Sequence, residues 1–206
     1  MAALRFLAAL CAVLLAAFAL NGAAAPFVVR LGAERVVLDT PVGFSDSLGL
    51  SSPRLQELAE SQTSASNKLL LFAISDADLR RFMNGDTPEF RRYMIAVIPA
   101  RIEHERLSAA QFAALVSDSQ RDLGPPPAAT DYVKHLDAQA PGGAHLLAEL
   151  RNDPAVMSVL HGTRLPAPEG QRDARPKYLL STTTLLRLRA KALTLSVFSG
   201  FDGPAD

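Results

Sequence analysis

Two apolar runs separated by a short basic break form the strongest pattern in this sequence. They occupy residues 177–201 and are rich in Leu, Thr, Val and Phe, a composition typical of paired strands. In the second run Leu193, Leu195 and Val197 alternate with Thr194 and Ser196, as in a strand with one face toward a core and one toward water. The pattern predicts a β-hairpin.

The break between the two runs carries three cations, Arg187, Arg189 and Lys191. Charges at the middle of a membrane span are costly, so the cations favour a solvent-exposed hairpin turn over a span. If one apolar face of this hairpin lacks a cover, it is a candidate contact surface.

The preceding chain alternates between strand-like and helix-like segments. Residues 68–74 are a continuous apolar run, which indicates a strand buried on both faces, and Ser108 with Gln111 forms the capping pattern of a helix over 108–123. Strands are also predicted at 27–31, 35–39, 91–98 and 157–163, and helices at 53–60 and 75–84, with a short helix at 132–138 and one helical turn at 146–150. Residues 163–176 are polar and proline-punctuated, which predicts a loop.

Hairpin-like strand pairs at both ends of this order predict an α+β fold, with a mainly antiparallel β-sheet of about six to seven strands covered by helices. Residues 35–44 run from a strand into a Pro-x-Gly-aromatic turn at Pro41, Gly43 and Phe44. With the closing strand pair, this segment resembles the PsbP/Mog1/DcrB-like group of α/β/α sandwiches. The resemblance implies a non-enzymatic accessory or binding protein. Members of that group end in a helix, so here that helix is absent or the chain is truncated after residue 206.

The N-terminal residues have the organisation of a secretory signal peptide. Arg5 precedes an apolar run over 6–20 and then small residues before Pro26. The run is shorter than the roughly 20 residues of a membrane-spanning helix, and a cut after Ala24 satisfies the small-residue rule. We therefore expect a signal peptide at 1–24, a single α+β domain at 25–206, and a periplasmic or secreted location in a bacterial envelope.

Charge and cysteine content narrow the possible partners. The chain has 21 Lys and Arg against 21 Asp and Glu, and the signal peptide removes one cation. Without a basic excess we expect no nucleic-acid partner and no membrane association after signal cleavage. The one cysteine, Cys11, lies within the signal region, so the mature chain contains no disulfide and no thiolate-ligated metal.

No catalytic or metal motif is recognisable, and we assign no catalytic, cofactor-binding or metal residue. The four histidines, His104, His135, His145 and His161, lack the i, i+4 spacing of a zinc peptidase, and no GxSxG elbow is present. The Glu103-His104-Glu105 triplet is interpreted as a solvated charge cluster.

Two groups of charged residues are also candidate sites. Asp76 and Asp78 fit the first turn of a helix, where acids complement the helix dipole. The pairs Arg80-Arg81 and Arg91-Arg92 would form an anion-binding patch if the fold brought them together, and otherwise they are separate solvated arginines.

The sequence therefore supports three hypotheses. The first is an exported, non-enzymatic interaction or accessory module of the cell envelope, with an envelope protein as partner and no cofactor. The second is a small-molecule or lipid binder with an apolar cleft between sheet and helices. The third is a hydrolase whose site is assembled from distant residues, with a histidine close to a serine or carboxylate.

Overall fold

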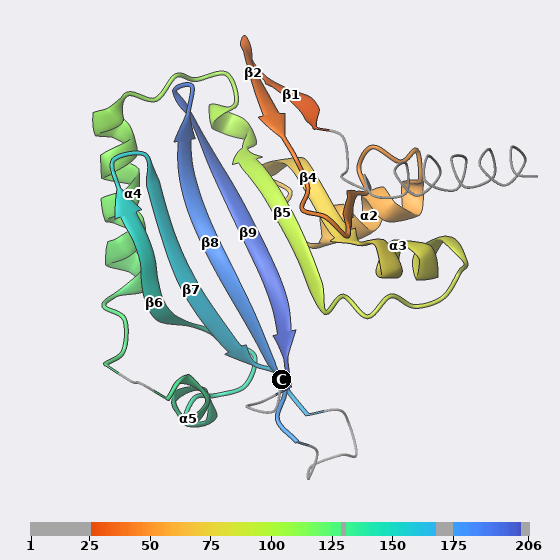
Figure 1. The fold of residues 1–206 in the computed structure, drawn as a ribbon. Helices are drawn as coiled ribbons and strands as arrows, with labels where there is room; N and C mark the ends of the chain where they lie inside the picture. The colour runs from red at the N-terminus through yellow and green to blue at the C-terminus, as the bar shows by residue number, and fades with distance from the viewer. Residues whose placement is uncertain (1–25, 129–130, 168–174, 203–206) are drawn as a thin grey trace, which may run out of the picture.

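The computed structural model describes residues 26–128, 131–167 and 175–202. The predicted signal peptide lies outside these residues. The described chain forms a seven-stranded sheet and a separate two-stranded hairpin, with helices packed against the sheet (Figure 1). This arrangement confirms the predicted α+β class and the antiparallel sheet.

The main sheet is antiparallel throughout, and its strand order is β3-β4-β5-β9-β8-β7-β6. The strands are β3 (Phe44–Asp46), β4 (Asn67–Ser75), β5 (Arg92–Pro99), β6 (Ala144–Asp153), β7 (Val156–Arg164), β8 (Tyr178–Leu188) and β9 (Lys191–Phe201). The predicted closing hairpin is therefore β8 and β9, and it lies at the centre of the sheet. Strands β1 (Phe27–Leu31) and β2 (Glu34–Leu38) pair only with each other.

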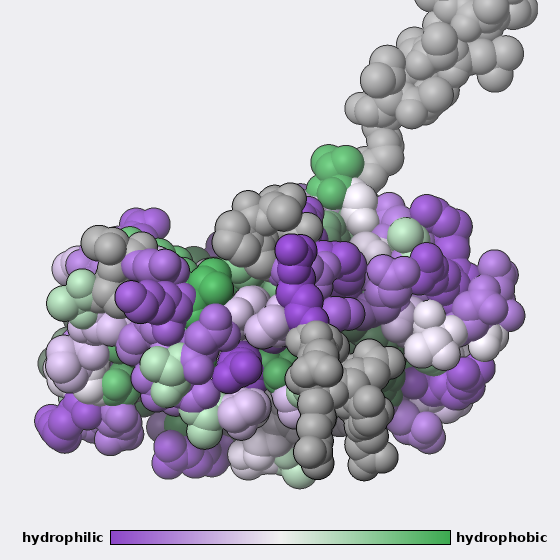
Figure 2. Space-filling model, turned by 90° about the horizontal axis from the view of Figure 1, so that it is seen from below, coloured by the Kyte–Doolittle hydropathy of each residue, from purple (hydrophilic) through white to green (hydrophobic). Residues whose placement is uncertain are grey.

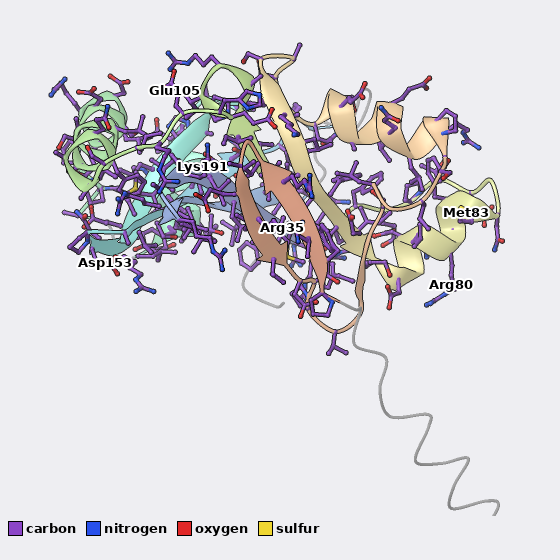
Figure 3. The ribbon with its side chains drawn as sticks, turned by 90° about the horizontal axis from the view of Figure 1, so that it is seen from above. Arg35, Arg80, Met83, Glu105, Asp153 and Lys191 are labelled. Carbon is purple, nitrogen blue, oxygen red and sulfur yellow. The ribbon has the colours of Figure 1, made fainter. Side chains whose placement is uncertain are left out.

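The helices and the β1–β2 hairpin together cover both faces of the sheet. The helices are α2 (Pro53–Ser61), α3 (Asp76–Met83), α4 (Ala109–Leu123) and α5 (Tyr132–Asp137), with a 3-10 turn η1 (Ala100–Ile102). Seen from above, the β1–β2 hairpin and α2 lie on opposite sides of β4 (Figure 3). Leu180 and Leu186 lie on the same face of β8. Leu180 packs in the core cluster beneath α5, and Leu186 packs in the core cluster beneath the hairpin. Helix α5 and the hairpin therefore share one face, and α2, α3 and α4 cover the other.

Several local predictions are confirmed. Residues 70–74 of β4 are all buried, as the apolar run indicated, and the Ser108–Gln111 capping box at α4 is complete. Pro53 begins α2, and the Ser75 side chain caps α3. The loop predicted at 163–176 joins β7 to β8, and a hydrogen bond from the Leu165 N–H to the Lys177 carbonyl closes its base. Residues 168–174 of that loop lie outside the described residues.

The predicted helical turn at 146–150 is wrong, because these residues belong to β6. The pairing of β6 with β7 is shifted twice, between Leu146 and Ala148 and between Glu149 and Arg151. Each bulge inserts an extra residue and interrupts the alternation that marks a strand. The period-two pattern of a strand is therefore lost over this segment, although Leu146 and Leu147 still lie on opposite faces of the sheet, as neighbouring strand residues do. Strand β3 was also missed, because it has three residues at the sheet edge.

The predicted exposure of the β8–β9 turn is wrong for one of its three cations. Arg189 and Ala190 form a two-residue turn with positive φ angles of 51° and 59°. Lys191, the next residue, is 1% exposed. Strand β9 also differs from the expected half-buried strand, because Thr194 and Ser196 are partly buried while Val197 on the supposed core face is 37% exposed.

Among the described residues, no helix is both long enough and apolar enough to cross a membrane.

Candidate functional site

The first candidate site is the β1–β2 hairpin, whose inner face is fixed to the core. Leu31 and Val36 are 0% and 2% exposed, and they pack against residues of β4, β5 and β9. A two-residue turn at Gly32 and Ala33 joins the strands, and Gly32 has a φ of +59°, which glycine adopts without steric cost. The hairpin is therefore held firmly against the sheet by its inner face.

The outer face of the same hairpin exposes apolar surface. Val28 and Val37 lie directly opposite each other across the strand pair and are 58% and 62% exposed. Seen from below, hydrophobic residues stand out from the polar surface where the described chain begins, next to β1 (Figure 2). Two neighbouring exposed valines on a rigid strand pair are a small apolar contact point.

Two arginines lie next to these valines on the outer face. Arg30 and Arg35 are exposed and directly opposite each other in the register of β1 and β2. Figure 3 labels Arg35 on the hairpin. In the part of the chain that the structure describes, neither arginine has an ion-pair partner. Like charges directly opposite in an antiparallel pair destabilise it, so this pair is a local cost to the fold.

We refer to Val28, Arg30, Arg35 and Val37 together as the outer hairpin face. These four residues were not predicted from the sequence as a site, although the signal is present. In both strands the buried and outward residues alternate with period two, so the polar and apolar residues of the outer face could have been assigned to it from the sequence.

A second candidate site is an apolar pocket of about 370 Å³ between α5 and the sheet. We refer to it as the α5 pocket. Two polar residues at the start of α5, Asp131 and Tyr132, lie at its rim. Its apolar lining comes from five elements and consists of Val133, Leu136, Leu147, Leu160, Leu180 and Phe201. This is the kind of cleft that the binder hypothesis required, and its lining residues come together only through the fold.

Contacts at the end of α5 hold this helix over the sheet. The Tyr178 hydroxyl donates to Asp137 Oδ1 at 2.8 Å, and Arg164 donates to the Asp137 carbonyl at 3.3 Å. Burial raises the pKa of Tyr178, and the bond to Asp137 acts in the same direction. Under the helix, Gly162 leaves room for Leu136, because a Cβ atom there would lie 2.7 Å from Leu136 Cδ1.

Three of the four arginines of the possible anion-binding patch line one pocket of about 580 Å³. Arg81, Arg91 and Arg92 line it, whereas Arg80 lies on the outer side of α3 (Figure 3). Arg81 pairs with Glu89 at 2.5 Å. Arg91 pairs with Asp202 at 2.6 Å.

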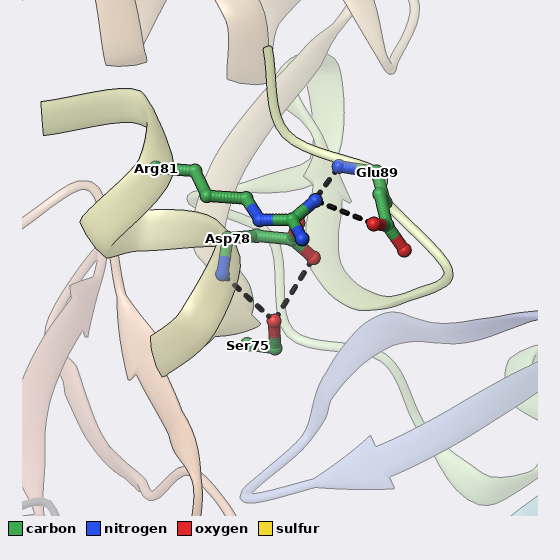
Figure 4. Close-up of polar contacts among 4 residues, drawn as sticks. All are labelled: Ser75, Asp78, Arg81 and Glu89. Carbon is green, nitrogen blue, oxygen red and sulfur yellow. Dashed lines mark hydrogen bonds and ion pairs between the residues drawn. The ribbon is translucent and has the colours of Figure 1, made fainter. Parts of the chain in front are cut away.

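The same pocket contains the buried carboxylate of Asp78 (Figure 4). Asp78 accepts from the Ser75 hydroxyl at 2.9 Å and from the Glu89 N–H at 2.8 Å. These bonds tie the loop after α3 to the start of the helix. Asp76 and Asp78 do lie in the first turn of α3, as expected, but Asp78 also has this second role. Because protein carboxylates already occupy Arg81 and Arg91, this pocket carries no anion-site proposal.

The Glu103-His104-Glu105 triplet is organised by the buried Lys191. The Lys191 ammonium donates to the Glu103 carbonyl at 2.7 Å and to the Glu105 carbonyl at 2.6 Å. The Glu103 carboxylate pairs with Lys68 at 2.5 Å, and that bond lowers the pKa of Glu103. The triplet thus has a structural role, because two of its backbone carbonyls accept hydrogen bonds from the buried Lys191 ammonium.

The histidines are not brought together. Within the described ranges, no side chain of His104, His135, His145 or His161 has a hydrogen bond to a serine or a carboxylate. The described residues also contain no group of three His, Cys, Asp or Glu that could hold a metal ion. The hydrolase hypothesis therefore stays without a candidate triad in this part of the chain.

His161 gives a pH-dependent prediction. Burial on the sheet lowers the pKa of His161 below its value in the unfolded chain, which is about 6.5. The unfolded state then binds the proton more readily, so stability should fall as pH drops below about 6.5, by at most about 1.4 kcal/mol per pH unit. Denaturant unfolding at pH 7.5 and 5.5 should show a smaller loss for His161→Asn than for the wild type. Equal losses in both proteins would contradict the assignment.

The fold and these sites define an α+β protein with a seven-stranded antiparallel sheet, an exposed N-terminal hairpin and an apolar pocket. No protein-family model, no curated protein and no solved structure matches this chain. The resemblance to the PsbP/Mog1/DcrB-like group stays a prediction.

Proposed function

We propose that this protein is an exported, non-enzymatic interaction module that binds an acidic protein partner through the outer hairpin face. The observation that carries the proposal is the pair Arg30 and Arg35, exposed and opposite each other beside Val28 and Val37. The location rests on the signal-like residues 1–24, and the proposal needs neither a cofactor nor a membrane.

The partner's chemistry follows from the arginines. A guanidinium presents a planar set of donors that matches a carboxylate, and arginine is enriched at protein interfaces. Two guanidiniums on adjacent strands, flanked by apolar side chains, suit a protein surface with neighbouring Asp or Glu residues around an apolar residue. Carboxylates placed between Arg30 and Arg35 would also relieve their mutual repulsion.

The rigidity of the hairpin supports the same proposal. The inner side chains Leu31 and Val36 are buried in the core, so the outer residues are presented without a folding step. A preorganised surface loses less conformational freedom on binding than a mobile one. The exposed like-charge pair lowers the stability of the hairpin, and residues that lower local stability are expected at functional positions.

Substitution of one arginine should reveal how much the repulsion between Arg30 and Arg35 destabilises the hairpin. Arg30→Glu places opposite charges directly across the strand pair, which contributes roughly 0.2–1 kcal/mol in antiparallel sheets. We therefore expect the purified variant to be more stable than the wild type by several tenths of a kcal/mol in denaturant unfolding, while it binds the partner less well. An unchanged or lower stability would show that Arg30 and Arg35 do not repel each other as the register implies.

Binding is tested by capture with charge variants. Mature protein immobilised on a resin should retain an acidic partner from envelope extract, and Arg30→Glu/Arg35→Glu should reduce that retention at least tenfold. The double variant keeps a like-charge pair, so hairpin stability stays matched to the wild type. Arg121→Glu on α4 is the control, because this exposed arginine lies away from the hairpin. Equal capture by the double variant and the wild type would overturn the proposal.

A further inference from the structure

We infer that the α5 pocket binds a small amphiphile, with an apolar tail between α5 and the sheet and a hydrogen-bond-donating or cationic head at Asp131. The site is separate from the outer hairpin face and does not depend on the proposed protein partner. The ligand class follows from the volume of the pocket, its lining and the charge at its rim.

The volume and lining favour an apolar tail. At about 370 Å³ the pocket falls at the small end of the range for ligand sites, which is about 300–1,000 Å³. It is more than twice the roughly 150 Å³ of an apolar cavity that stays dry and takes up benzene. Water in the pocket finds no hydrogen-bond partner among the apolar side chains of Leu147, Leu160, Leu180 and Phe201. Replacement of that water by an apolar group is therefore favourable.

The pocket is built into the fold. Leu136 fills the space above Gly162, and the Tyr178–Asp137 bond fixes the end of α5 to the sheet. The residues at the start of the helix then border an open space, and the end of the helix is packed closed. A ligand would therefore enter beside Asp131 and Tyr132, with its tail directed along the sheet.

The rim selects the head group. Asp131 is the charged residue among the described residues that line the pocket, and its Oδ1 accepts from the Lys134 N–H at 3.0 Å. A carboxylate with a second oxygen accepts hydrogen bonds and repels anions. An alkylammonium or an alcohol would meet an acceptor at this rim, whereas a fatty acid would place its own carboxylate against Asp131.

The test uses a neutral fluorescent probe, Nile red, with the purified mature protein. Saturable binding of one probe per chain is expected, together with displacement by octylamine and octanol at concentrations at least tenfold lower than octanoate requires. Absence of saturable binding would overturn the inference, and so would octanoate displacing the probe as well as octylamine does.

Variants locate the site and separate tail from head. Leu180→Phe should fill the pocket and weaken probe binding at least tenfold, while the exposed Leu150→Phe on β6 is the matched control and should bind as the wild type does. Asp131→Asn keeps a good helix cap and should abolish the preference for octylamine over octanoate, which keeps the test decisive if Leu180→Phe folds poorly. Unchanged binding by Leu180→Phe, or an unchanged preference in Asp131→Asn, would refute the assignment. Arg30→Glu/Arg35→Glu should bind the probe normally, so failure of the partner proposal and failure of this one are distinguishable.

Discussion

Replacing Lys191 by alanine should destabilise the protein by about 3 kcal/mol or more, since hydrogen bonds to charged groups contribute roughly 1.5–3 kcal/mol each. The ammonium donates two such bonds, to the Glu103 and Glu105 carbonyls, and the side chain that carries it is buried. Alanine removes both the donors and the packed stem. Lys191→Met keeps most of the stem and should cost less than Lys191→Ala, and denaturant unfolding measures both.

The neighbouring Lys68 supplies the control for this prediction. Lys68 pairs with the carboxylate of the same Glu103, but its side chain is 40% exposed. Exposed ion pairs contribute about 0–1 kcal/mol, so Lys68→Ala should have a small effect. If Lys191→Ala costs no more than Lys68→Ala, the two carbonyl contacts do not hold the segment before α4 to the β8–β9 turn.

Gly162→Ala should destabilise the protein by roughly 1–3 kcal/mol, the usual cost of overpacking a core. A Cβ atom at this position would lie 2.7 Å from Leu136 Cδ1 and 2.8 Å from Leu147 Cδ1, and both leucines are buried. The glycine has no positive φ, so backbone strain does not contribute. Thermal or denaturant unfolding gives the cost, and weaker Nile red binding would show that α5 has shifted.

Gly200→Ala on β9 is the matched control for the substitution at Gly162. The nearest atom to a Cβ there is the Arg91 carbonyl oxygen at 3.6 Å, an ordinary contact. Alanine in a strand also limits the unfolded chain more than glycine does, so this variant should be neutral or slightly stabilising. Equal destabilisation by both variants would mean that general strand effects, and not the packing of α5, explain the loss at Gly162.

The fold class was readable from the sequence because its strongest elements obey local rules. The Leu-, Thr- and Val-rich composition of the β8–β9 pair, the apolar run of β4 and the capping box of α4 each mark their element from neighbouring residues alone. Strand β6 was not readable, because two bulges interrupt the alternation of residues between the two faces of the sheet.

The sites differ in how far sequence could predict them. The outer hairpin face follows from alternation in β1 and β2, whereas the α5 pocket combines side chains from α5 and four strands. The burial of Lys191 was also beyond local reasoning. A lysine beside a turn is usually solvated, and here the carbonyls that accept from it lie in a segment 86 and 88 residues away.

A photocrosslinking amino acid at position 37 tests the proposed interaction most directly. Val37 is 62% exposed on the outer hairpin face, and Leu150 on the edge strand β6, 54% exposed, is the control position. Irradiation of envelope extract with the purified protein should yield one discrete adduct at position 37 that contains an acidic protein, and that adduct should disappear in Arg30→Glu/Arg35→Glu. No adduct at position 37, or the same adducts at positions 37 and 150, would contradict the account.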